Sequence, residues 1–209
     1  MAEEMPELKC ALASYEASKY ACEHWHYSKC LPRGKLFLVG VWEDDRFIGV
    51  VIFSRGAVQN IGKPYGLEQI ECVELTRIAL REHRHFVSEI MMKAFRILKQ
   101  TNPGLRLIVS YADPMQGHNG SIYQATNWIY TGITPPQRAY KINGKIVHAR
   151  TIQNRKPKYL KESQYIELMY KNAERIITQG KHKYLMPLDK KIRKQIEKLR
   201  KPYPKKKDE

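Results

Sequence analysis

The chain has 209 residues, 43% of them hydrophobic, which suits one core domain of about 150 residues with an appendage. Its formal net charge of +16 indicates a polyanionic partner: DNA, RNA or an anionic membrane surface. The membrane is the weakest of these, because no stretch approaches the roughly 18 apolar residues of a span. The N-terminus is acidic and unlike a signal peptide, which indicates a cytoplasmic chain. The four cysteines contain no CxxC pair, which indicates reduced thiols and no structural zinc.

Hydrophobic periodicity and turn residues predict an α/β protein with a mixed central sheet flanked by helices. Strand 69–80 alternates, with Val73, Leu75 and Ile78 facing inward. The expected elements are, in chain order, a helix at 8–21, strands at 35–42, 47–54 and 69–80, a helix at 86–99, a strand at 105–111, a helix at 121–127, and strands at 128–131 and 139–152.

The positive charge is concentrated towards the C-terminus. Residues 1–154 contain 19 Lys and Arg against 14 Asp and Glu, whereas residues 155–209 contain 18 against 7. We therefore predict a catalytic domain over 1–154 and a basic helical C-terminal extension over 155–209. Helices are expected at 164–179 and 190–201, with Asp189 as the N-cap of the second, and disorder is expected at 202–209.

The helix at 190–201 is the first candidate binding surface. Lys190, Lys191, Arg193 and Lys194 lie within its first turns, where they could neutralise phosphates and release counterions. A solvated helix or a packing arm is the alternative. The one-sided charge and the interleaved tyrosines favour contact with nucleic acid.

Two histidines in the loop after the first helix form a second candidate. His24 and His26 are spaced as i and i+2, and together with Asp113 or His118 they could bind a metal. Isolated histidine pairs are more often structural.

Charged residues on and after strand 69–80 form a third candidate. Glu74 and Arg77 are costly to bury on an internal strand unless they pair with each other or serve a site. Arg84 and Ser88 precede and open the next helix, whose N-terminus attracts anions. The alternative for Glu74 and Arg77 is an ion pair at the surface, and the alternative for Ser88 is that it only caps or opens the helix.

Asp113 follows a buried strand, at the edge of the sheet where ligands gather in α/β proteins. It could act as a general base or a metal ligand. It could also only start the turn before Pro114.

Several motifs occur in order over residues 20–155: His26-Tyr27-Ser28 with Pro32-x-Gly34-Lys35, Gly62-Lys63-Pro64-Tyr65-Gly66, Glu74-Leu75-Thr76-Arg77, Ser110-Tyr111-Ala112-Asp113 with Gln116-Gly117-His118, and Tyr123-Gln124-Ala125-x-Asn127-Trp128. Together, these motifs closely resemble the Mom family of phage DNA-modification proteins, and the segment 184–191 resembles its relatives.

This resemblance implies a fold of the GNAT superfamily of N-acetyltransferases for residues 1–154. It also implies conversion of adenine in double-stranded phage DNA to N6-carbamoylmethyladenine in the host cytoplasm, which shields the DNA from host restriction enzymes. The usual glycine-rich loop that holds the pyrophosphate of coenzyme A has no glycine here, over 81–86. Simple transfer from acetyl-CoA would moreover leave an acetyl group. The cofactor is therefore acetyl-CoA or another activated donor, and iron is considered, with His26, Asp113 and His118 as its candidate ligands.

The resemblance also suggests roles for single residues. The target adenine is expected to flip out of the duplex. The residues expected to stack on it or to bind DNA are Tyr27, Tyr65, Trp128, Tyr123 and Lys35. His26 or Asp113 would take the N6 proton, and Glu74 and Arg77 would orient the donor. Arg81, Arg84 and Ser88 would bind the donor's phosphate or carboxylate.

Two other functions remain open. One is a conventional acetyl-CoA-dependent N-acetyltransferase that acts on a protein or a small amine. The other is a DNA-binding protein without enzymatic activity. The sequence also leaves the oligomeric state open, a homodimer being one possibility.

Overall fold

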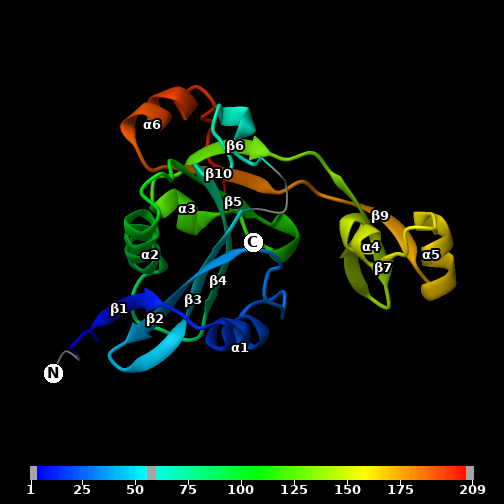
Figure 1. Cartoon of the computed structure of the whole chain (residues 1–209), viewed down its shortest axis with the longest axis horizontal. Coiled ribbons are helices and arrows are strands. Elements are labelled where there is room, and N and C mark those ends of the chain that lie inside the picture. Colours follow the sequence, from blue (N-terminus) through cyan, green and yellow to red (C-terminus); the bar gives the residue numbers. More distant parts are fainter. Residues whose placement is uncertain (1–3, 56–59, 206–209) are drawn as a thin grey trace.

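The computed structural model describes residues 4–55 and 60–205. Its centre is a seven-stranded mixed sheet (Figure 1), as the sequence predicts. All neighbouring strands are antiparallel except β4 and β5, which are parallel. In sheet order the strands are β1 (Leu8–Leu12), β2 (Leu36–Glu43), β3 (Arg46–Ser54), β4 (Cys72–Leu80), β5 (Leu107–Ala112), β10 (His182–Pro187) and β6 (Ile129–Ile133).

Helices cover both faces of this sheet because its strands alternate apolar side chains to either side. Helix α2 (Val87–Thr101) packs its apolar stripe on one face, over Val51 and Phe53. Helices α1 (Tyr15–Trp25) and α6 (Lys190–Glu197) lie on the other. The short α3 (Ser121–Ala125) and the 3-10 turns η1 (Lys63–Tyr65) and η2 (Pro114–Gln116) lie in the connections. None of the helices among the described residues is long and apolar enough to cross a membrane.

Residues 137–178 form a separate lobe that projects from the central sheet (Figure 1). Its small core contains Tyr140, Ile142, Ile152 and Ile166. The lobe consists of β7 (Gln137–Ile142), β8 (Lys145–His148), α4 (Ala149–Arg155), α5 (Glu162–Met169) and β9 (Glu174–Thr178).

The chain enters the lobe from β6 and leaves it into β10. The two connecting segments are held together, since Thr134 N–H donates to Lys181 O (2.9 Å) and Lys181 N–H donates to Thr134 Oγ1 (2.9 Å). A Cβ added at Gly180 would collide with the backbone of Thr134, so the two segments cross in close contact.

The division predicted at residue 154 does not follow this packing, because that position lies inside α4. The segment after it contributes β10 to the central sheet and buries Ile192 and Ile196 of α6 against it, so it is not a purely helical appendage. The expected disorder at 202–209 is also wrong for 202–205, because the Tyr203 hydroxyl donates to Trp128 O (2.5 Å). Residues 206–209 and Gly56 lie outside the described residues.

Three secondary-structure predictions are wrong in their detail. Residues 8–12 form strand β1, because pairing with β2 outweighs a helical composition. The predicted strand 139–152 divides into β7, β8 and the start of α4, and the predicted helix 164–179 covers the end of α5 and all of β9. Short elements of this kind depend on tertiary pairing more than on local propensity.

A bulge in β4 determines how the strand presents its side chains. Phe53 pairs with Leu75 and Ile52 pairs with Arg77, so Thr76 is an extra residue opposite β3. The alternation therefore changes phase, and Leu75 and Ile78 both pack against the α2 side of the core. Ile78 thus packs against the core although it is only half-buried.

The pairing of β4 with β5 ends early. The last paired residues are Leu75 and Ser110, although β4 continues to Leu80. Beyond this point the two parallel strands diverge, and neither fills the space between them. The fold therefore leaves an opening in the middle of its own sheet.

We expect Gly120→Ala to lower the free energy of unfolding by about 2–4 kcal/mol. The reason is that Gly120 has φ of 84° and an added Cβ would collide with the fully buried ring of Tyr184. Gly117→Ala is the matched control, since its φ is 71° and no atom lies within 4 Å of the added Cβ. Urea denaturation measures both variants, and equal losses would contradict the expected clash.

Candidate active site

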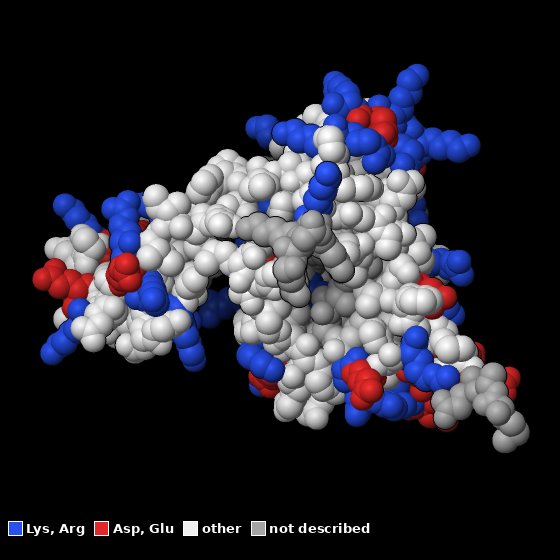
Figure 2. All heavy atoms as spheres, turned by 180° about the vertical axis from the view of Figure 1, so that it is seen from behind, with Lys and Arg blue, Asp and Glu red and all other residues white. Residues whose placement is uncertain are grey.

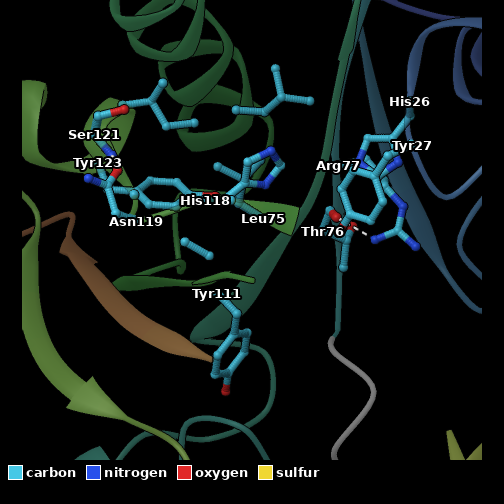
Figure 3. A pocket seen from close by; sticks show the side chains of 15 residues that line it. His26, Tyr27, Leu75, Thr76, Arg77, Tyr111, His118, Asn119, Ser121 and Tyr123 are labelled. Atoms are coloured by element: carbon cyan, nitrogen blue, oxygen red, sulfur yellow. Dashed lines mark hydrogen bonds between the residues drawn. The ribbon is translucent and has the colours of Figure 1, made fainter. Parts of the chain in front are cut away.

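A cavity of about 240 Å³ lies where β4 and β5 diverge. Figure 3 shows His26, Tyr27 and Arg77 on one side of it and His118 and Tyr123 on the other. These side chains come from the end of α1, from β4, and from the loop and helix that follow β5. The cavity therefore collects residues that are far apart in the sequence.

His26 is held in the neutral state. It ends α1 in an extended conformation, and the following chain turns back so that Ser28 N–H donates to its Nδ1 (3.1 Å). Because Nδ1 accepts this hydrogen, the neutral ring carries its own proton on Nε2. Burial is the largest cause that lowers the pKa of His26, to about 4, and the positive charge of Arg77 adds to it. At neutral pH this imidazole is a hydrogen-bond donor, and it is not a cation.

Tyr27 and His118 form the exposed rim of the cavity. Their rings lie 5.6 Å apart in an edge-to-face arrangement, and the ring of Tyr27 also lies 4.2 Å from that of His26. His118 lies on the loop between Gly117 and Gly120, which both have left-handed backbone angles. Within the described part of the chain, neither ring nitrogen of His118 has a hydrogen-bond partner. Its ring is therefore open to a ligand in the cavity.

Arg77 provides the positive charge of the site. Its Nη1 donates to Thr76 O (2.7 Å), as Figure 3 shows, while its Nε is buried and has no partner among the described residues. A buried donor without a partner costs about 1–3 kcal/mol, and the Arg77 side chain lines the cavity. This guanidinium is therefore suited to an oxygen of a substrate or donor.

Tyr123 is a fixed wall of the cavity. Ser110 Oγ donates to Leu75 O (2.8 Å), so the Tyr123 hydroxyl donates to Ser110 Oγ (2.8 Å). Burial raises the pKa of Tyr123 to about 12, which keeps it protonated. The hydrogen bonds fasten the last paired residues of β4 and β5 to α3, and thereby fix the place where the strands separate.

The structure does not place Asp113 among the residues that line the cavity. Its Oδ2 lies 2.9 Å from Lys181 Nζ, and its Oδ1 accepts from Met115 N–H (3.0 Å). The carboxylate thus stabilises the start of the loop 113–120 and links that loop, through Lys181, to the segment that leaves the lobe. It is a positioning residue in this arrangement.

His26 and His118 both line the cavity, but Asp113, the third predicted metal ligand, does not. No group of three or more His, Cys, Asp or Glu side chains that could hold a metal ion occurs among the described residues. His26 uses Nδ1 for Ser28, and Asp113 is occupied by Lys181. The residues present at this site therefore do not fit the iron considered from the sequence.

Three of the aromatic residues predicted to bind DNA are buried: Trp128, Tyr65 and Tyr123, of which Tyr123 is 8% exposed and forms a wall of the cavity. Trp128 is 0% exposed and Tyr65 is 5% exposed, and both belong to the hydrophobic core. They cannot stack on a base, because they already pack against their neighbours. Tyr27, 49% exposed, is the aromatic residue of the predicted set that a base could reach. Lys35 is exposed just before β2, and Glu74 is half-buried on β4 outside the cavity lining.

The predicted anion site at the start of α2 is filled by the protein itself. Oε1 of the buried Glu43 accepts from the backbone N–H groups of Arg84 (2.7 Å) and His85 (2.8 Å). The Glu89 carboxylate accepts from Phe86 N–H (3.2 Å) and so caps the helix. A phosphate would have to displace these carboxylates.

The side chains predicted to bind the donor are also directed elsewhere. The guanidinium of Arg81 lies 5.7 Å from the centre of the Trp25 ring, and Arg84 Nη1 donates to Glu4 O (3.2 Å). Ser88 lies in the first turn of α2 and does not line the cavity. This region therefore does not fit the pyrophosphate of coenzyme A.

The sequence as a whole matches one protein family. The model of the Mom protein family aligns with residues 7–205. The chain belongs to the Mom family. The methylcarbamoylase Mom of Escherichia phage Mu is 26% identical over 208 residues, which cover 95% of this chain and 84% of that protein.

Solved structures show which fold this Mom-family chain has. A structure assigned to an acetyltransferase of Acinetobacter baylyi is 10% identical with a TM-score of 0.51, and the match covers 90% of this chain and 96% of that chain. A structure assigned to a phosphinothricin N-acetyltransferase is 13% identical with a TM-score of 0.52, covering 88% and 100%. The predicted GNAT-like α/β fold is thus confirmed.

We expect Glu43→Gln to lower the free energy of unfolding by about 1.5–3 kcal/mol at pH 7, because two N–H groups lose a charged acceptor. Burial alone would raise the pKa of Glu43, but the N–H groups of His85 and Arg84 outweigh it and the pKa is lowered. The stabilisation is therefore present above the carboxyl's ordinary pKa and is lost as the pH falls through the lowered one. Urea denaturation at several pH values tests this, with the exposed Glu68→Gln as control. If Glu43→Gln still had a lower free energy of unfolding than the unsubstituted protein in acid, this explanation would be contradicted.

We expect the His26 ring to remain neutral down to about pH 4, because its charged form is desolvated and lies near Arg77. The unfolded chain takes up this proton near pH 6.5. His26 therefore destabilises the fold progressively as the pH falls from about 6.5 to about 4. NMR titration of the imidazole measures the midpoint directly, and a midpoint at or above pH 6 would overturn this assignment.

Proposed function

We propose that this protein is an enzyme that adds a carbamoylmethyl group to adenine N6 in double-stranded DNA. The observation that carries the proposal is the cavity between β4 and β5, where a neutral His26, Arg77 and an unoccupied His118 converge. The Mom-family relative that is named a methylcarbamoylase supports the reaction. The net charge of +16 supports a nucleic-acid substrate.

The adenine has to leave the duplex to reach this site. A stacked and paired base cannot present N6 to a cavity inside a protein, so the nucleotide is extruded. Tyr27 at the rim offers a ring face to the extruded base, and Tyr123 bounds the cavity behind it. Both side chains are among those predicted to contact the base.

The cavity residues divide the chemistry between them. A bond forms between N6 and the methylene carbon of the donor, the bond from that carbon to its leaving group breaks, and the leaving group departs with the electron pair. His118 takes the N6 proton, because the exocyclic amine is a weak nucleophile and this imidazole is free to accept. Arg77 and the Nε2–H group of His26 hold the carboxamide oxygen and align the carbon.

The donor is an activated molecule whose reactive carbon enters between β4 and β5. Acetyl-CoA as such has no leaving group on its methyl carbon, and transfer of its acetyl group to N6 would give an amide in place of a methylene link. Its pyrophosphate would also compete with Glu43 for the N–H groups before α2. A donor anchored elsewhere fits the residues better.

The modified base also explains a protective role. Adenine N6 lies in the major groove, where it donates to side chains that read the sequence. A carbamoylmethyl group there would block host restriction enzymes that recognise this edge. The activity then takes place in the host cytoplasm, where phage DNA is replicated.

Mass spectrometry of nucleosides from plasmid DNA tests the reaction in cells that express the protein. We expect a deoxyadenosine species heavier by one carbamoylmethyl group, absent with Arg77→Met and His118→Asn and retained with Glu68→Gln. Asp113→Asn should lower the yield, because it breaks the ion pair with Lys181.

Other results would overturn the proposal. An acetylated adenosine would indicate ordinary acyl transfer to the base. Turnover of acetyl-CoA without DNA would indicate a conventional acetyltransferase. Unmodified DNA that nevertheless binds the folded protein would indicate a DNA-binding protein without this activity.

A further inference from the structure

The positive charge of the molecule is divided between two separate bodies. The first 136 residues contain 15 Lys and Arg against 14 Asp and Glu, so the part that contains most of the cavity is nearly neutral. The lobe (residues 137–178) contains 10 against 3, and residues 179–209 contain 12 against 4. Almost all of the net charge of +16 thus lies on the lobe and on the C-terminal segment.

Most of the basic side chains of the lobe are exposed to solvent. Eight are exposed, and none of them forms an ion pair within the part of the chain that the structure describes. One of the three carboxylates of the lobe, Glu162, is already occupied by the Tyr140 hydroxyl and the Gln153 amide. The exposed residues are Arg138, Lys141, Lys145, Arg155, Lys158, Lys161, Lys171 and Arg175.

The lobe is folded independently of the cavity but is firmly attached beside it. Its core residues pack on one another, and no lobe residue lines the cavity. The connection that leaves it contains Lys181, which pairs with Asp113 at the start of the cavity loop. The lobe therefore adds nothing to the chemistry, while its charges are held at a fixed place next to the site.

The lobe and α6 lie at opposite ends of the same strand. The lobe precedes the first residue of β10, and α6 follows its last. Six residues of strand span about 20 Å. Figure 2 shows Lys and Arg side chains gathered on α6 and around the lobe, and a surface between them that is mostly uncharged. Along a duplex, about 20 Å corresponds to roughly six base pairs.

We propose that the lobe is a second DNA-binding surface. It binds the duplex backbone on one side of the target nucleotide, and α6 binds the backbone on the other side. This inference rests on the proposed function. Phosphate contacts fix position and register without reading sequence. Two surfaces that flank the cavity would hold the duplex while one nucleotide between them is extruded, which a single basic helix does not achieve.

Three charge-matched variants of the full chain test the proposal. The lobe variant is Lys141→Gln, Lys145→Gln and Lys158→Gln. The α6 variant is Lys190→Gln, Lys191→Gln and Lys194→Gln. The control variant is Lys9→Gln, Lys19→Gln and Arg96→Gln, which removes three exposed charges from the nearly neutral part. All substituted side chains are exposed, so the fold is retained.

Fluorescence anisotropy with a duplex of about two helical turns measures affinity at several salt concentrations. The lobe and α6 variants should each weaken binding about tenfold or more, and each should reduce the slope of log affinity against log salt by about 3. The control should bind like the unsubstituted protein. A lobe variant that binds like the control overturns the proposal, and so does equal weakening by all three, which indicates a response to net charge alone.

The nucleoside measurement separates this proposal from the proposed function. If the unsubstituted protein modifies adenine and the lobe variant both binds and modifies DNA normally, the lobe proposal fails and the proposed function stands. If the unsubstituted protein modifies no base but the lobe variant alone loses affinity for the duplex, the lobe proposal stands and the proposed function fails.

Discussion

The site depends on the premature end of one strand pairing. Strands β4 and β5 are parallel only as far as Leu75 and Ser110, and the Ser110 hydroxyl fastens this last pair to Tyr123. Parallel strands normally continue to share hydrogen bonds, so a fixed separation point opens a cavity inside an otherwise closed core. The bulge at Thr76 then places Arg77 at the cavity, while Ile78 both lines the cavity and packs against the α2 side of the core.

Strand β10 connects this site to the rest of the molecule. It comes from late in the chain, yet it lies between β5 and β6 in the sheet and pairs with both. Its two ends carry the lobe and α6, so the nearly neutral domain holds two basic bodies at a fixed spacing. The same strand thus determines where the two basic bodies lie and where the cavity lies.

The start of α2 shows how this chain departs from a simple anion-binding turn. In this chain the N–H groups of Arg84 and His85, just before α2, donate to the Glu43 carboxylate. The turn is therefore stabilised by a contact within the protein. In the proposed reaction, the donor therefore depends on the residues at the strand divergence, where Arg77 and His26 are. An internal carboxylate excludes an external anion because the two would repel each other and compete for the same donors.

The sequence by itself determined the α/β class, the hairpin at β2 and β3, the helix α2, and the residues His26, Tyr27, Arg77 and Tyr123 that the cavity collects. Periodicity and motifs are local, so they are readable along the chain. Only the tertiary structure decided that Trp128 and Tyr65 are buried, that Asp113 pairs with Lys181, that Glu43 fills the anion site and that β10 completes the sheet. Glu43 and Arg84 are 41 positions apart, and Asp113, Lys181 and the partners of β10 are also far apart in the chain, so no local pattern records these contacts.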